Sequence, residues 1–152
     1  MLTCACLDVP PAGIGALDAA VGLDAATSFT VSRSVNVPLP DGGGPVEDEL
    51  EVQPICAIAG TTVDVDIIHG YRGDIVILLT SPTVRTVTLK EFSDGDDEDD
   101  VIGNYPLTLT PVESLDAFTG LPATGIWTLR VEDVDAGTTG SLTGWALNLT
   151  CM

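Results

Sequence analysis

Basic side chains are scarce in this chain. Lysine and arginine together number 5 against 23 aspartate and glutamate residues, which gives a formal net charge of −18, and Lys90 is the only lysine. A protein that binds nucleic acid needs Lys and Arg to neutralise phosphates, so DNA and RNA are excluded as expected partners. The acidic surface fits either a simple solubilising role or a salty or calcium-rich setting in which cations relieve the repulsion.

Long apolar runs and catalytic histidine patterns are also missing. No stretch approaches the ~20 consecutive apolar residues of a membrane helix, so no membrane span is expected. His69 is the only histidine, no G-x-S-x-G nucleophile elbow exists, and Ser81 and Ser93 lie in turn contexts. Asp64 and Asp66 share one strand face without an apolar cleft that would separate their pKa values for acid–base work. We therefore expect that the chain is not an enzyme and that His69 fills the loop that follows it.

Cysteine usage leaves the cellular compartment open. The cysteines are Cys4, Cys6, Cys56 and Cys151, without the paired C-x-x-C spacing of a zinc site. They allow three pairings, and a bridge from Cys151 to Cys4 or Cys6 that ties the termini together is one hypothesis. The first residues lack the basic and long apolar regions of a secretory signal. Either the domain was cut from a longer secreted precursor and Met1 was added, or Met1 is native and the protein acts in the cytoplasm or in a particle assembled there.

Composition and periodicity predict an all-β fold. Apolar residues make up 45% of the chain and aromatics only 5%, and the many Val, Thr, Gly and Pro residues favour strands and turns. The 152 residues fit one domain with a substantial core. About eight short strands separated by turn signals indicate a β-sandwich of jelly-roll type. We expect strands near residues 29–38, 49–58, 62–68, 74–80, 84–91, 106–110, 126–133 and 143–150.

The N-terminal region differs from the rest. Residues 1–28 are rich in Ala, Gly, Pro and Asp without sustained periodicity, which predicts an arm or linker with a possible short helix at residues 16–26. The sandwich is expected over residues 29–152. The apolar run at residues 75–79 predicts a central strand covered on both faces, and the acidic run at residues 94–100 predicts an exposed loop.

The two tryptophans of the chain lie in consecutive predicted strands. Residues 124–133 and 140–149 both alternate apolar and polar side chains, and Trp127 and Trp145 each share a strand face with aliphatic residues. Only a short Gly/Thr turn separates the two runs. We therefore expect a closing hairpin of neighbouring strands, with both indoles in the core.

Several motifs of the chain resemble one family. The sequence His69-Gly70-Tyr71-Arg72-Gly73-Asp74, followed by an apolar strand and Ser81-Pro82, resembles the H-x-Y-R-G-D-L-x-I-x-L-x-S-P segment of the P domain (Homo B domain) of proprotein convertases and secreted bacterial proteases. Val37-Pro38-Leu39-Pro40-Asp41 resembles the I-P-I-P-D entry of the bacterial members. Residues 111–120 are similar to the P-x-x-x-L-x-x-F-x-G stretch that precedes the G-x-W-x-L strand. The match covers residues 35–150 in the family's order and spacing.

The chain departs from the family pattern at two places. Thr83-Val84 replaces the usual glycine after Ser-Pro, which affects only a turn. The acidic run at residues 94–100 replaces a Gly/Asn-rich loop, so no metal site or contact can be carried over from that loop. Arg72-Gly73-Asp74 spells an integrin-recognition tripeptide, but in the family these letters belong to the entry of a strand, and we discount the motif.

The resemblance implies a jelly-roll sandwich and a non-catalytic, accessory role. Such a P domain docks on a subtilisin-like catalytic domain, stabilises it and tunes its response to pH and calcium, so the expected partner is a protein and the expected location is extracellular. A second hypothesis is a self-contained structural protein, either an extracellular filament subunit or a virus capsid decoration protein, that uses residues 1–28 to grip a neighbouring subunit. A third is a carbohydrate-binding module, which would need an exposed aromatic platform from Tyr71, Tyr105 or Phe118.

Turns dense in Asp and Gly predict calcium as a possible structural cofactor. Ca²⁺ takes six to eight oxygen ligands, which such turns supply, and the resemblance to jelly-roll modules of bacterial proteases supports this hypothesis. The alternative for Asp74 and Asp133 is that each accepts backbone N–H bonds that hold its own turn. The candidate ligands are Asp41, Asp74, Asp133 and Asp135, with a second set formed by Asp94, Asp96 and Asp97.

Overall fold

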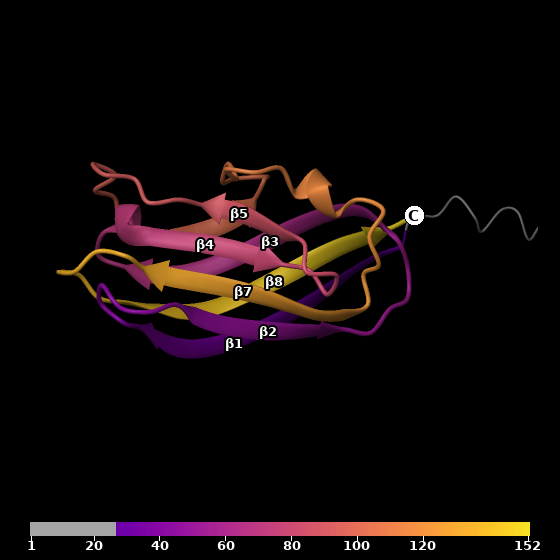
Figure 1. The fold of residues 1–152 in the computed structure, drawn as a ribbon, viewed down its shortest axis with the longest axis horizontal. Coiled ribbons are helices and arrows are strands. Elements are labelled where there is room, and N and C mark those ends of the chain that lie inside the picture. Colours follow the sequence, from indigo (N-terminus) through magenta and orange to yellow (C-terminus); the bar gives the residue numbers. More distant parts are fainter. Residues whose placement is uncertain (1–26) are drawn as a thin grey trace, which may run out of the picture.

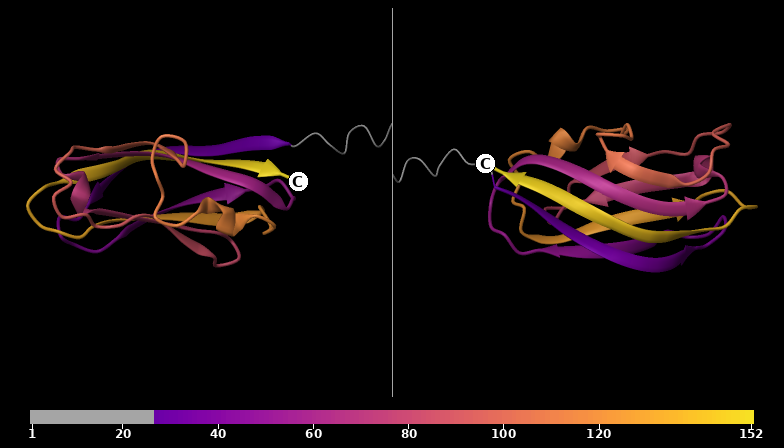
Figure 2. Two further views of the ribbon diagram at one scale, coloured as in Figure 1. Left: turned by 90° about the horizontal axis from the view of Figure 1, so that it is seen from above. Right: turned by 180° about the vertical axis from the view of Figure 1, so that it is seen from behind.

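Two antiparallel sheets face each other in a computed structural model that describes residues 27–152. Figure 1 shows the strands along the long axis, and Figure 2 shows the two layers from above. Short 3-10 turns lie at η2 (Arg72–Asp74) and η3 (Leu115–Phe118). The prediction of an all-β sandwich is confirmed. The strands are β1 (Ser28–Leu39), β2 (Val46–Val52), β3 (Ile58–His69), β4 (Ile75–Thr80), β5 (Thr86–Lys90), β6 (Val101–Tyr105), β7 (Gly125–Asp133) and β8 (Gly140–Cys151).

The strands are divided equally between the two sheets. Sheet A has the order β1-β8-β3-β6, and sheet B has the order β2-β7-β4-β5. The predicted closing hairpin is therefore wrong, because β7 pairs with β2 and β4 whereas β8 pairs with β1 and β3. Residues 134–139 cross from one sheet to the other. Period-2 alternation determines which side chains face the core and carries no information about the neighbouring strand.

The core lies between the sheets and contains both tryptophans, as predicted. Trp127 on β7 and Trp145 on β8 are buried from opposite sheets. Phe118 of η3 meets Trp127 edge to face, with ring centroids 5.0 Å apart. The indole Nε1 of Trp127 donates to the backbone oxygen of Ala123 at 2.9 Å, so its polar edge is satisfied inside the core.

One predicted strand is misplaced. The sixth strand lies at Val101–Tyr105, before the predicted residues 106–110, which form a turn and loop. Pro106 offers no N–H to a ladder, and the N–H of Thr108 turns back to the carbonyl of Asn104 at 2.8 Å. The Thr and Leu residues of this segment suggested β propensity, but the proline and the local turn bonds decide its structure.

Two further strand predictions are confirmed only in part. The strand expected at residues 49–58 runs over Val46–Val52 and ends just before Pro54. The strand β4 does lie centrally, between β7 and β5. Its outward-facing Val76 and Leu78 are only half-buried, so no second layer of the described chain covers that face.

A disulfide joins Cys56, just before β3, to Cys151 at the end of β8. The hypothesis that Cys151 pairs with Cys4 or Cys6 is therefore wrong. Those two residues, the possible helix at 16–26 and almost all of the predicted arm at 1–28 lie outside the described residues, so the domain boundary stays a prediction. The described part of the chain contains no helix that is long and apolar enough to cross a membrane.

Candidate functional site

The single histidine of the chain is buried at one end of the sandwich. The strands β3 and β7 end at His69 and Asp133, and these two residues are 1% and 0% exposed. The Nε2 atom of His69 lies 3.1 Å from Oδ2 of Asp133, and its Nδ1 atom lies 2.7 Å from the carbonyl oxygen of Tyr71. As expected, His69 fills the loop that follows it. Neither ring nitrogen is free to act on a substrate.

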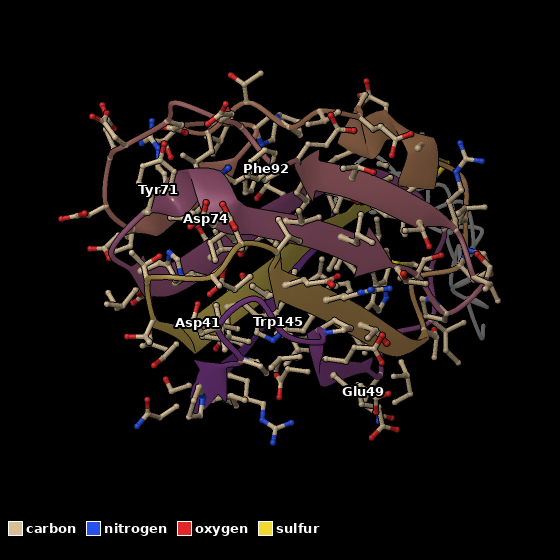
Figure 3. The ribbon with its side chains drawn as sticks, turned by 60° about the vertical axis from the view of Figure 1, so that its left-hand side comes forward. Asp41, Glu49, Tyr71, Asp74, Phe92 and Trp145 are labelled. Atoms are coloured by element: carbon tan, nitrogen blue, oxygen red, sulfur yellow. A yellow bond between two sulfur atoms is a disulfide. The ribbon has the colours of Figure 1, made fainter. Side chains whose placement is uncertain are left out.

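The first set of predicted calcium ligands lies at this same end, where Figure 3 labels Asp41 and Asp74. Asp41 Oδ1 accepts the N–H of Gly137 at 2.8 Å, and Asp135 Oδ1 accepts the N–H of the residue that follows it at 2.9 Å. Asp74 is buried and accepts a hydrogen bond from the Thr138 hydroxyl at 3.3 Å. Asp135 thus holds its own turn, whereas Asp41 and Asp74 contact the segment that crosses between the sheets, residues 134–139. The alternative interpretation, in which Asp74 and Asp133 accept N–H bonds of their own turns, is not borne out, because these two carboxylates are bound by the side chains of Thr138 and His69.

The carboxylate of Asp133 behaves differently. Its Oδ2 atom is bound by His69, but the buried Oδ1 atom has no hydrogen-bond partner among the described residues. A buried carboxylate oxygen without a hydrogen-bond donor is a suitable ligand for a cation. Within residues 27–152, however, no three His, Cys, Asp or Glu side chains are grouped so that they could hold a metal ion. Calcium binding stays a prediction.

The second set of predicted ligands lies in the acidic loop, residues 94–100, which is anchored by Arg72. The guanidinium Nε donates to both carboxylate oxygens of Asp96, at 2.9 and 3.0 Å, and Nη1 lies 2.6 Å from Glu98. The hydrogen bond from Arg72 is the main cause that lowers the pKa of Asp96 below its ordinary value. Asp94 and Asp97 are exposed, as predicted for this loop.

The acidic loop also depends on Gly73. The N–H of Gly73 donates to the carbonyl of Asp96, and the carbonyl of Gly73 accepts the N–H of Ser93. A Cβ atom at position 73 would lie 2.5 Å from the backbone oxygen of Ser93. Only glycine allows this close approach. The Arg-Gly-Asp tripeptide is therefore a structural support for the loop, with Gly73 and Asp74 buried.

A hollow of ≈ 500 Å³, here called the edge groove, opens beside β5 and β6. These are the edge strands of sheets B and A on the same side of the sandwich. Leu89 and Tyr105 form part of its buried lining, and burial raises the pKa of the Tyr105 hydroxyl to about 12. Lys90 also lines the groove, and burial is the main cause that lowers its pKa.

The outward face of sheet A carries a ladder of polar side chains. The Thr30 hydroxyl donates to Asn148 Oδ1 at 2.7 Å. The amides of Asn148 and Asn104 each donate to one oxygen of the Asp64 carboxylate, at 2.7 Å. Both oxygens of Asp64 are thus engaged, and Asp66 beside it is exposed. Asp64 on β3 thus acts as an acceptor that connects this strand to Asn104 on β6 and Asn148 on β8.

The aromatic platform that a carbohydrate-binding module would need is not formed by the predicted residues. Tyr105 and Phe118 are buried. Tyr71 is half-buried, and its hydroxyl accepts the N–H of Gly95 at 3.1 Å. The one strongly exposed aromatic ring among residues 27–152 is that of Phe92, on the edge groove.

Sequence reasoning missed two features. Asp48 is buried although it is charged, and the alternation of Val46, Asp48 and Leu50 already placed it on the inward face of its strand. Phe92, which follows β5, and Ile102 on β6 are both exposed, and both line the edge groove. That neighbourhood depends on sheet topology, and the local sequence carried no signal for it.

Comparison with known proteins identifies the family. The model of the proprotein convertase P-domain matches residues 58–149, which span β3 to β8. The chain is 32% identical over 116 residues to the transglutaminase-activating metalloprotease of Streptomyces mobaraensis, covering 76% of this chain and 14% of that protein. It is 31% identical over 122 residues to leupeptin-inactivating enzyme 1 of Streptomyces exfoliatus, covering 79% of this chain and 25% of that protein. The chain thus spans a small part of these curated relatives.

Solved structures show the same fold at low identity. The serine protease of Aeromonas sobria matches with a TM-score of 0.63 and 17% identity, covering 90% of this chain and 29% of that one. FLHE matches with a TM-score of 0.55 and 15% identity, covering 83% of this chain and 96% of that one. Since the family model matches well over half of the described sandwich, this chain belongs to the proprotein convertase P-domain family.

Proposed function

We propose that this sandwich is a non-catalytic accessory domain of a protease, which acts by docking on a protein partner and stabilising it. The observation that carries the proposal is the P-domain match over β3 to β8. Support comes from the curated relatives, which are a metalloprotease and a leupeptin-inactivating enzyme in which the matching part is 14% and 25% of the length. In both, most of the chain lies outside the part that resembles this domain.

The buried histidine supports a role without catalysis. His69 is the only imidazole of the chain, and its nitrogens contact Tyr71 and Asp133. A Ser–His or Cys–His hydrolase needs its imidazole within hydrogen-bond reach of a nucleophile and of the substrate. The contacts of His69 are to a backbone carbonyl and a buried carboxylate instead. We therefore expect no peptidase activity from residues 27–152 alone.

The disulfide supports an extracellular location. Cys56 and Cys151 are bonded across 95 residues. Disulfides persist in oxidising compartments and are rare in the cytosol. Peptide mapping of the protein purified without reductant should recover one cross-linked pair that contains these two cysteines. Recovery of both as free thiols from freshly isolated native material would count against this location.

A domain exchange tests the accessory role. In the Streptomyces mobaraensis metalloprotease, the 32% identical segment would be deleted, or replaced by residues 27–152 of this chain. We expect the replacement to restore part of the melting temperature and of the activity half-life that the deletion loses, because a docked domain stabilises the folded enzyme by mass action at high effective concentration.

An unrelated β-sandwich inserted at the same position is the matched control. It shows how much stability any folded domain restores at that position. The accessory role predicts that this control behaves like the deletion. If residues 27–152 do no better than the unrelated sandwich, the proposal is wrong for this class of partner.

A second candidate is the structural subunit that assembles through residues 1–28. The observation in its favour is that the fold fills 96% of the FLHE chain, so a sandwich of this kind occurs as nearly a whole chain. The oligomeric state of full-length and truncated protein separates the two candidates, as described in the Discussion.

A further inference from the structure

We propose that the edge groove binds an extended segment of a partner protein in which apolar side chains alternate with lysine or arginine. The inference rests on the proposed accessory function, because it names the chemistry of the surface on which this domain would dock. Three independent features of the groove carry it: an exposed apolar rim, an open strand edge and an acidic flank.

The rim of the groove is apolar and exposed. Phe92, Ile102 and Val112 line it with exposed fractions of 46%, 56% and 52%, and they come from three different segments of the chain. Large apolar side chains gathered around a hollow on an otherwise highly charged protein are typical of an interaction site. A volume of ≈ 500 Å³ accommodates a few side chains of a strand and is small for a docked helix.

The wall of the groove offers backbone groups for strand pairing. The strand β6 is the last strand of sheet A, so one of its edges has no partner strand. At Asn104 the N–H and C=O groups turn outward to Thr108, with distances of 2.8 Å. Backbone groups two residues apart point to the same side of an antiparallel strand, which places those of Ile102 on this open edge. The groups of Asn104 are already satisfied by the turn at Thr108, so a partner segment would form its main-chain hydrogen bonds at Ile102.

The flank of the groove is acidic and free to attract cations. Asp94, Asp97 and Asp99 in the acidic loop are exposed and form no ion pair with a residue of the described chain. Asp96 is neutralised by Arg72, and Asp100 Oδ1 accepts the N–H of His69. Exposed carboxylates beside an apolar rim favour a segment that combines apolar and basic side chains.

The net charge of the chain also favours a basic partner segment. A formal charge of −18 repels a second copy of this chain and steers basic partners toward it. Lys90 is the exception inside the groove, because its ammonium contacts only the carbonyl of Glu91 and no carboxylate of residues 27–152. Arg72, the other cation of the groove, is already occupied by Asp96 and Glu98.

Fluorescence polarisation with labelled peptides tests the proposal directly. The probe is acetyl-Val-Lys-Val-Lys-Val-Lys-Val-amide, and its matched controls carry Glu in place of Lys or Ser in place of Val. We expect the probe to bind the full-length protein at least about tenfold more tightly than either control, because each control lacks one of the two required features. Raising the NaCl concentration from about 50 to about 300 mM should weaken binding of the probe. Equal affinity for the Ser control would overturn the apolar part of the proposal, and tighter binding of the Glu control would overturn the basic part.

Two groove variants locate the binding site. The combined change Phe92→Ser and Ile102→Thr removes exposed apolar surface and should reduce affinity at least about tenfold while the salt dependence remains. Lys90→Met removes the unpaired cation and should tighten binding of the basic probe. Unchanged affinity in the Phe92/Ile102 variant, shown to be folded by its thermal transition, would overturn the assignment to this groove.

A pair of charge variants separates local from general attraction. Asp94→Asn, Asp97→Asn and Asp99→Asn together remove three charges beside the groove and should weaken binding and flatten its salt dependence. The control removes the same number of charges from β2, at the opposite edge of sheet B, where Figure 3 shows Glu49 far from Phe92. It consists of Glu47→Gln, Glu49→Gln and Glu51→Gln. Equal effects of both triple variants would mean attraction to the whole protein only, and the proposal would fail.

The domain exchange distinguishes failure of this inference from failure of the proposed function. If the wild-type sandwich and the Phe92/Ile102 variant stabilise the metalloprotease equally, the groove assignment is wrong and the accessory role stands. If the peptide binds as expected but the sandwich does not stabilise the enzyme, the groove stands and the accessory role is wrong.

Discussion

The indole Nε1 of Trp145 donates a hydrogen bond to Oδ2 of Asp48 at 2.8 Å, which links β8 of sheet A to β2 of sheet B. Asp48 is only 8% exposed, and its other oxygen lies 3.3 Å from Nη1 of Arg33. A carboxylate on the inward face of a strand is tolerated only where donors offset its desolvation. The hydrogen bond between Trp145 and Asp48 therefore connects the two sheets on the side that lies opposite the edge groove.

Replacement of Asp48 should remove this connection between the sheets and lower the stability of the fold. Asp48→Leu leaves the indole N–H of Trp145 buried and unpaired, which should lower the free energy of unfolding by about 1–3 kcal/mol. Asp48→Asn keeps an acceptor oxygen and should cost less. Urea unfolding followed by tryptophan fluorescence measures both, with the exposed Glu49→Gln as control. An Asp48→Leu protein as stable as wild type would show that the hydrogen bond contributes nothing.

His69 and Asp133 should act as a coupled pair. His69→Ala or Asp133→Ala each leaves a buried polar partner unsatisfied, at a cost of about 1–3 kcal/mol. The double variant should lose less than the sum of the single losses, with a coupling of about 0.5–3 kcal/mol. Asp135→Ala, on an exposed neighbour, should change stability by less than about 0.5 kcal/mol. Strictly additive losses would contradict the pairing seen at 3.1 Å.

Alkaline pH should destabilise the fold through Tyr105. Burial raises its pKa to about 12, whereas in the unfolded chain it titrates near pH 10. The folded state therefore keeps a proton that the unfolded state releases, so the stability contribution is complete below about pH 10 and is lost as the pH rises through about 12. Urea midpoints between these pH values should fall in wild type. They should fall less in Tyr105→Phe, and an equal fall in both would exclude Tyr105 as the cause.

Calcium should stabilise the protein more than sodium at equal ionic strength if a site exists. Screening acts on all the carboxylates, whereas site binding adds a linkage contribution to the melting temperature. The buried, unpartnered Oδ1 of Asp133 and the nearby Asp74 are the atoms most suited to such a site. CaCl₂ at about 5 mM exceeds the dissociation constants of about 0.1–1 mM that are typical of weak extracellular sites. The difference in melting temperature between wild type and Asp74→Asn should therefore be larger in CaCl₂ than in NaCl of equal ionic strength. Identical differences in both salts would remove the calcium hypothesis.

Deletion of the N-terminal region distinguishes the two candidate functions. The deletion should end at residue 26, because the carbonyl of Thr27 accepts the N–H of Cys151 and Ser28 pairs with Thr150 in β1. For an assembly subunit, the truncated sandwich should remain folded while oligomers disappear, since the proposed arm is gone. For an accessory domain, full-length and truncated proteins should both sediment as monomers. A truncated protein that assembles as well as the intact one would eliminate the arm hypothesis.

Local patterns in the sequence predicted most of the strands and the inward faces of those that carry the two tryptophans. Trp127 and Trp145 follow period-2 alternation, and both are in the core. Strand partners were not predictable in this way, because the crossing of residues 134–139 between sheets leaves the alternation on either side unchanged. The same limit applies to the site. The contact between His69 and Asp133 joins residues 64 positions apart, and neither position carries a local signal for the other.

The disulfide divides the molecule into two parts with different mechanical properties. Cys56 and Cys151 close a covalent ring that contains β3 to β8 and coincides with the family match at residues 58–149. The strands β1 and β2 precede the ring and form the outer edges of the two sheets on one side. A force applied through the N-terminus therefore peels β1 and β2 away first, and the ring limits how far the rest of the chain can extend. As long as the bond stays oxidised, this domain can yield at one edge under tension without losing the strands that line the edge groove.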